Sequence, residues 1–146
     1  MGTTFSLFLA FVLGASISVY HPMNGIMSRV TRSPVLTNVV FYFFAFTSSL
    51  LMLFFYGGFK QFLRIKDIPP ILYITGVMSA IMVLGTIVLI PRLGTRKLFI
   101  LQVAGQIAMS VAVSNFGLFE TPRDPLTLRK ALGTVVMLVG AAISVL

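Results

Sequence analysis

Five long apolar segments follow one another along the chain, separated by short connections that carry prolines and charged residues. They cover residues 4–28, 34–58, 69–90, 96–119 and 127–146. Each approaches or exceeds the ~20 residues of helix that cross the ~30 Å hydrocarbon core of a bilayer. We therefore predict an all-α membrane protein, with five transmembrane helices forming one domain over residues 1–146.

Residues typical of helix ends lie at the borders of these segments. Ser33-Pro34 is expected to start the second helix as N-cap and first helical residue, Pro69-Pro70 the third, and Thr127 the fifth. The first segment has no basic residue before it and no small-residue cleavage site within it, so we expect a span and not a signal peptide.

Polar residues recur at helical spacing within the apolar segments. The fourth carries Gln102, Gln106 and Ser110 four residues apart, with alanines on the opposite face. Such a stripe either ties helices together or faces a wet cavity. The polar residues of the first two segments have the same two interpretations. The cavity candidates from spacing are Ser18, His21, Asn38, Tyr42, Gln102, Gln106 and Ser110.

Small residues on helix faces allow close packing between helices. Gly76 with Ala80 and Gly140 with Ser144 are small-xxx-small pairs in the third and fifth segments. The full set of expected packing positions is Gly14, Gly25, Gly76, Ala80, Ala104, Ala108, Gly140 and Ser144.

Composition supports an integral membrane protein. The chain is 58% hydrophobic and 10% charged, with a mean hydropathy of +1.03, against about 45–50% and 25% in soluble domains. The absence of cysteine excludes disulfides and thiolate chemistry. We find no metal-ligand cluster and no phosphate-binding loop after a strand, so we expect no metal, no cofactor and no enzyme activity. The net charge of +8 is assigned to lipid headgroups and topology, not to nucleic acid.

The basic residues divide almost equally between the two sides of a five-span topology. The second and fourth connections carry six and the first and third carry five, whereas a fixed orientation normally shows a clear cytoplasmic excess. We therefore expect insertion in both orientations and an antiparallel homodimer, a ten-helix unit with the geometry of an inverted-repeat transporter. A pair with a paralogous partner half is the alternative. The six basic residues of the second and fourth connections are Lys60, Arg64, Lys66, Arg123, Arg129 and Lys130. The five of the first and third connections are Arg29, Arg32, Arg92, Arg96 and Lys97.

Several motifs resemble one known family. They are HPMNGIMSR around Asn24, Pro91-Arg92-Leu93-Gly94, Gly105-Gln106, Asn115-Phe116-Gly117-Leu118-Phe119, and the Pro-Arg-Asp-Pro-Leu-Thr segment. Over nearly its whole length the chain resembles the YdcZ-like branch of the drug/metabolite transporter superfamily. The resemblance implies a prokaryotic inner-membrane protein equivalent to half of a ten-helix transporter. It also implies that Asn24 and Gln106 either line the cavity or contribute to helix packing.

The acidic residues separate this chain from the small multidrug-resistance exporters, which depend on a carboxylate in their first span. Here Asp67, Glu120 and Asp124 all lie in connections, so exchange of drug cations for protons lacks its carrier. Amides, hydroxyls and one imidazole suit a neutral or anionic organic solute better.

We therefore expect a secondary transporter that alternates access around a midplane site lined by the first and fourth helices. If protons drive transport, His21 is the titratable candidate within a span. Two alternatives stay open: a dual-topology anion channel, and a membrane subunit that transports nothing without a partner.

Overall fold

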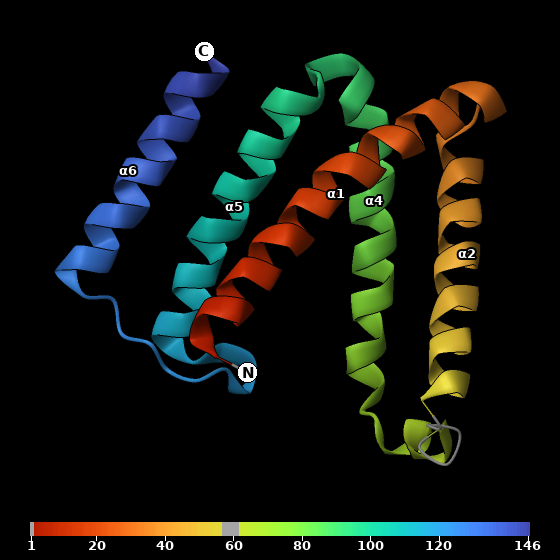
Figure 1. Cartoon of the computed structure of the whole chain (residues 1–146), viewed down its shortest axis with the longest axis horizontal. Coiled ribbons are helices and arrows are strands. Elements are labelled where there is room, and N and C mark those ends of the chain that lie inside the picture. Colours follow the sequence, from red (N-terminus) through yellow and green to blue (C-terminus); the bar gives the residue numbers. More distant parts are fainter. Residues whose placement is uncertain (1, 57–61) are drawn as a thin grey trace. The chain divides into compact units, whose positions relative to one another are not determined.

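The computed structural model describes residues 2–56 and 62–146, which form helices and no strand. Five helices are long and apolar enough to cross a membrane, as predicted. The predicted end of the second span at residue 58, and Lys60 in the charge count, lie outside the described residues. The long helices are α1 (Thr3–Thr31), α2 (Pro34–Phe55), α4 (Ile74–Leu93), α5 (Thr95–Phe116) and α6 (Leu128–Val145) (Figure 1). Short 3₁₀ turns cover Leu63–Asp67 (η1), Pro70–Tyr73 (η2) and Leu118–Glu120 (η3).

The predicted caps are present at two helix starts. The Ser33 hydroxyl accepts a hydrogen bond from the Leu36 amide at 3.1 Å, and Pro34 is the first residue of α2. The Thr127 hydroxyl accepts from the Lys130 amide at 3.4 Å at the start of α6. The third helix extends beyond the predicted end at residue 90, because Pro91 lies inside α4. A proline in the last turn removes only one intrahelical bond, and α4 ends before Gly94, whose φ is +77°.

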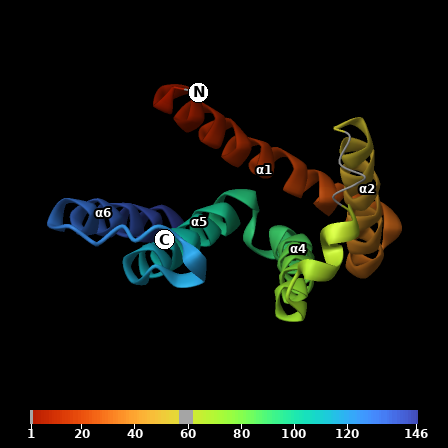
Figure 2. The same cartoon turned by 90° about the horizontal axis from the view of Figure 1, so that it is seen from below.

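The chain divides into two compact units, residues 1–92 and 93–146. In the first unit, α1 and α2 converge at the turn formed by Arg32 and Ser33 and diverge away from it in both views (Figures 1 and 2). α4 runs antiparallel to α2 and lies beside it.

The buried residues of the first unit gather near the α1–α2 turn. Thr37 is completely buried, and its hydroxyl bonds the Ser33 carbonyl at 3.1 Å and the Thr31 hydroxyl at 3.0 Å. On α4, Val83, Thr86 and Ile87 are buried. Residues 3–19 of α1 are all exposed. The core therefore occupies one end of the unit, where the helices are close enough to cover side chains.

The second unit pairs α5 with α6 through a loop that folds back on the end of α5. The Asp124 amide donates to the Ser114 carbonyl at 3.0 Å, and the Leu126 amide donates to Asn115 Oδ1 at 3.1 Å. Asp124 also forms an ion pair with Lys130 in the first turn of α6. Gly117 ends α5 with φ +62°, in the left-handed region. These bonds satisfy backbone groups at the end of α5 and fix the path of the loop.

Candidate functional site

One face of α1 carries the buried polar residues of that helix. His21, Asn24 and Gly25 are its buried residues, and their spacing of three and four places them on one side. His21 is 7% exposed and Asn24 is 4% exposed. Buried polar groups in a spanning helix are costly unless they are hydrogen-bonded or serve a function.

An aromatic stack joins this face of α1 to α2. The ring of Tyr20 stacks on His21, with centroids 4.4 Å apart, and on Phe41 of α2 at 5.8 Å. The edge of Phe41 in turn meets Tyr42, with centroids 5.2 Å apart. The imidazole is thereby held beside an aromatic surface and not in an aqueous environment.

Two hydrogen bonds join α2 to α4. The Asn38 amide nitrogen donates to the Ala80 carbonyl at 3.2 Å, and the hydroxyls of Tyr42 and Ser79 lie 2.6 Å apart. Asn38 and Tyr42 are four residues apart and half-buried, so they share one face of α2. The two bonds orient that face toward α4.

Two side-chain amide atoms, one on α1 and one on α2, are buried without a hydrogen-bond partner in the described part of the chain. They are the Asn24 amide nitrogen and the Asn38 amide oxygen. Leaving such a group unpaired costs about 1–3 kcal/mol. The Asn24 nitrogen is a hydrogen-bond donor and the Asn38 oxygen an acceptor.

Asn24 and Asn38 each lie in the half of their helix that adjoins the α1–α2 turn. Asn24 is seven residues before Thr31, the end of α1, or about 10 Å along the axis. Asn38 is four residues after Pro34, the start of α2, or about 6 Å. A midplane substrate site lined by the first and fourth helices stays a prediction. α1 and α2 diverge away from their turn, and the buried residues of both helices lie in the halves that adjoin it.

The structure separates the predicted cavity residues into two groups. Ser18, His21, Asn24, Asn38 and Tyr42 belong to the first unit, where all but the exposed Ser18 are buried or half-buried. Gln102, Gln106 and Ser110 belong to α5 in the second unit. Gln102 is half-buried, while Gln106 and Ser110 are exposed. A cavity role for the α5 residues stays a prediction.

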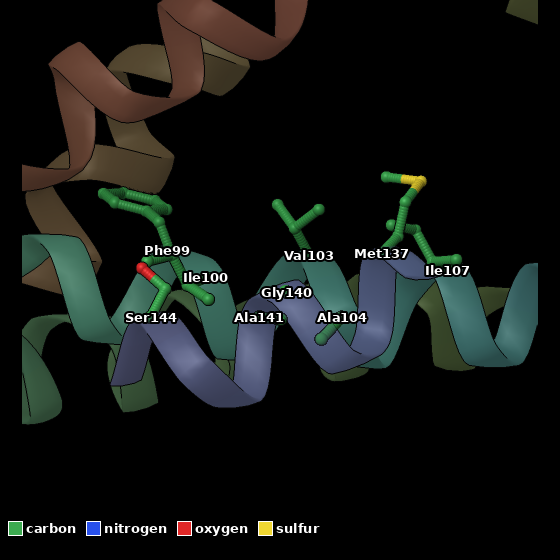
Figure 3. A pocket seen from close by; sticks show the side chains of 9 residues that line it. All are labelled: Phe99, Ile100, Val103, Ala104, Ile107, Met137, Gly140, Ala141 and Ser144. Atoms are coloured by element: carbon green, nitrogen blue, oxygen red, sulfur yellow. The ribbon is translucent and has the colours of Figure 1, made fainter. Parts of the chain in front are cut away.

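The predicted packing positions also differ in their surroundings. A Cβ on Gly25 would lie 3.7 Å from Ile90 Cγ2, an ordinary contact that places α1 against α4 at this glycine. Nothing lies within 4 Å of such an atom on Gly14 or Gly76. Ala80 is half-buried and Ala108 is exposed. Three further positions, Ala104, Gly140 and Ser144, line a groove between α5 and α6 (Figure 3).

Sequence reasoning missed several members of the buried polar site. Tyr20 stacks on His21, and the Ser79 hydroxyl lies 2.6 Å from that of Tyr42, yet neither residue was singled out. The buried Thr37, which bonds Thr31 and Ser33, was not singled out either. A signal existed for Thr37, because it stands beside Asn38 at the start of a strongly apolar helix. Tyr20 gave no comparable signal, since its role depends on Phe41 of another helix.

The site contains no acidic side chain, since Asp67, Glu120 and Asp124 lie outside the five spans. Across residues 2–56 and 62–146, no three His, Asp or Glu residues come together as metal ligands do. The side chains of this site can form hydrogen bonds and aromatic contacts.

Five helices long and apolar enough to cross a membrane in the described part of the chain, with buried polar residues on α1, α2 and α4, define a multi-pass membrane protein. A family model matches residues 5–143, with the description "Putative inner membrane exporter, YdcZ". The chain belongs to the YdcZ family of inner-membrane proteins. That description is of a transporter and not of an enzyme. Neither the curated proteins nor the solved structures contain a match to the chain.

Proposed function

We propose that the chain is one half of an exporter that moves a small, neutral, hydrogen-bonding organic solute across the inner membrane by alternating access. The observation that carries this proposal is that the buried amide nitrogen of Asn24 and the buried amide oxygen of Asn38 have no hydrogen-bond partner among the described residues. A solute that offers an acceptor to Asn24 and a donor to Asn38 offsets the cost of their burial. The aromatic rings of Tyr20, Phe41 and Tyr42 supply apolar surface where α1 contacts α2.

The absence of acidic residues from the spans favours a neutral solute over a cation. A cation that enters the membrane interior without a counter-ion loses its hydration without compensation. An amide or alcohol needs only the two hydrogen bonds. Anionic solutes are the second class that this site admits.

An antiparallel homodimer is part of the same proposal. Gln106 is exposed on α5 and has no hydrogen-bond partner among the described residues. An amide left in contact with lipid tails is unfavourable, so contact with a second copy provides a reason for its position. The nearly equal division of basic residues lets both orientations insert.

A thermal-shift panel in detergent tests the solute class. We expect neutral amides and polyols to raise the melting temperature with increasing concentration, since stabilisation grows as RT ln(1 + [L]/Kd). Quaternary ammonium compounds of equal size should give no shift. Stabilisation by the cations alone would overturn the proposed solute class.

Reporter proteins fused to the C-terminus test the dimer geometry. Because six basic residues face five, we expect active reporter on both sides of the membrane in comparable amounts. Replacing Arg92 and Arg96 with glutamine leaves six against three and should shift the population strongly toward one side. A wild-type reporter active on one side only would exclude the antiparallel homodimer.

A further inference from the structure

An apolar groove of about 360 Å³ runs between α5 and α6 in the second unit. Phe99, Val103 and Ile107 line it from α5, and Met137, Gly140 and Ser144 line it from α6. Figure 3 shows Phe99 and Ser144 at one end, with Ile107 and Met137 at the other. The distance from residue 99 to residue 107 is about 12 Å along a helix. The groove is thus long, narrow and almost entirely hydrocarbon.

The basic side chain of Arg96 lies at the end of the groove that contains Ser144. The Arg96 guanidinium donates a hydrogen bond to the Ser144 carbonyl at 3.0 Å, which leaves its other N–H groups for a second partner. Lys97 follows directly in the sequence. In the part of the chain that the structure describes, no acidic side chain lies within ion-pair distance of Arg96 or Lys97. The apolar groove therefore ends beside positive charge that has no acidic partner among the described residues.

We propose that this groove binds one acyl chain of an anionic phospholipid, whose phosphate is held by Arg96. Arg96 lies in the first turn of a spanning helix, where lipid phosphates are found. Guanidinium groups match the geometry of phosphate oxygens. Basic positions between transmembrane helices are known to bind anionic headgroups. The proposal concerns the second unit alone and does not depend on the proposed export function.

Charge favours a phospholipid over a second copy of the chain as the occupant. The chain has eleven basic residues and three acidic ones, so a second copy brings mostly positive charge toward Arg96. A phospholipid brings hydrocarbon for the groove and negative charge for its basic end. The lipid satisfies both features at once.

Binding to the purified full chain in neutral detergent tests the proposal. The probes are phosphatidylglycerol and phosphatidylcholine with identical acyl chains, titrated and measured by native mass spectrometry. We expect phosphatidylglycerol to bind about fivefold more tightly, the contribution of roughly one basic residue near a membrane surface. Glycerol phosphate, which has no acyl chain, should not compete.

Two variants separate the headgroup from the acyl chain. Arg96→Gln should remove the preference for phosphatidylglycerol, with Arg129→Gln at the start of α6 as the matched control. Gly140→Leu should weaken binding of both lipids, because a Cβ on Gly140 meets nothing within 4 Å and the leucine extends into the groove. Gly133→Leu has equal space in the same helix but does not line the groove, and should bind both lipids like the wild type.

Three results would overturn the proposal. The first is equal binding of the two lipids to the wild type. The second is unchanged binding in both Arg96→Gln and Gly140→Leu, measured on protein whose helix content matches the wild type. The third is a change in the monomer–dimer ratio of Gly140→Leu without a change in lipid binding, which would identify a second copy as the occupant.

Discussion

Replacing Asn24 with leucine should abolish solute transport without destabilising the protein. The Asn24 amide nitrogen is buried and unpaired, and such a group costs about 1–3 kcal/mol. Leucine has the same number of side-chain heavy atoms with the same branching, and it needs no hydrogen-bond partner. We therefore expect the free energy of unfolding in detergent to stay the same or rise by about 1 kcal/mol, while counterflow in proteoliposomes falls by more than tenfold. The counterflow solute is the one that stabilises the wild type most in the thermal-shift panel.

Asn38→Leu provides the matched comparison, because this residue also forms a structural bond. Its amide nitrogen donates to the Ala80 carbonyl of α4, so the substitution should cost about 1 kcal/mol of stability as well as transport. The account is contradicted if Asn24→Leu retains counterflow. It is equally contradicted if Asn24→Leu loses as much stability as Asn38→Leu, since Asn24 would then serve only to hold helices together.

Gly117→Ala should be among the most destabilising single-methyl changes in the chain. Gly117 has φ +62°, where an L-residue costs about 1–2 kcal/mol. A Cβ there would also lie 2.6 Å from Arg123 Cγ, so the Arg123 side chain must move. We expect the free energy of unfolding in detergent to fall by about 2 kcal/mol, measured by denaturant titration.

Gly105→Ala is the control for this substitution within the same helix. A Cβ on Gly105 meets nothing within 4 Å, and alanine is favoured over glycine in a helix by about 0.5–1 kcal/mol, so this variant should be slightly more stable. Truncating the neighbour in Gly117→Ala/Arg123→Ala should recover the part of the loss caused by the contact and leave the backbone part. Equal stabilities for Gly117→Ala and Gly105→Ala would show that the loop does not depend on this glycine.

The fold was predictable because its signals are local. Five apolar segments of membrane length, and the caps at Ser33 and Thr127, depend only on residues near one another in sequence. The helix that passes through Pro91 was not predicted, because a proline normally ends a helix and nothing in the sequence shows how the next residues pack. The structure explains the physical role of two motifs that carry the family resemblance, the one from Asn115 to Phe119 and the Pro-Arg-Asp-Pro-Leu-Thr segment. Asn115, Gly117 and Asp124 hold the loop to the end of α5.

For the site, the sequence could predict individual residues on each helix but not the contacts between helices. His21, Asn38 and Tyr42 were found because polar residues in apolar helices are conspicuous, whereas Asn24 came from the family resemblance. The stacking of Tyr20 on Phe41 and the bonds from Asn38 and Tyr42 to α4 were not foreseen, because they depend on how the helices pack. Helical spacing places residues on a face, but it does not say which helix covers that face.

Counterflow by the purified wild-type protein in proteoliposomes tests the central claim most directly. The account predicts saturable exchange of a neutral, hydrogen-bonding solute that accelerates when the same solute is present on both sides, as expected for a carrier with alternating access. Ion conductance without solute exchange, or no flux of any stabilising solute, would contradict it.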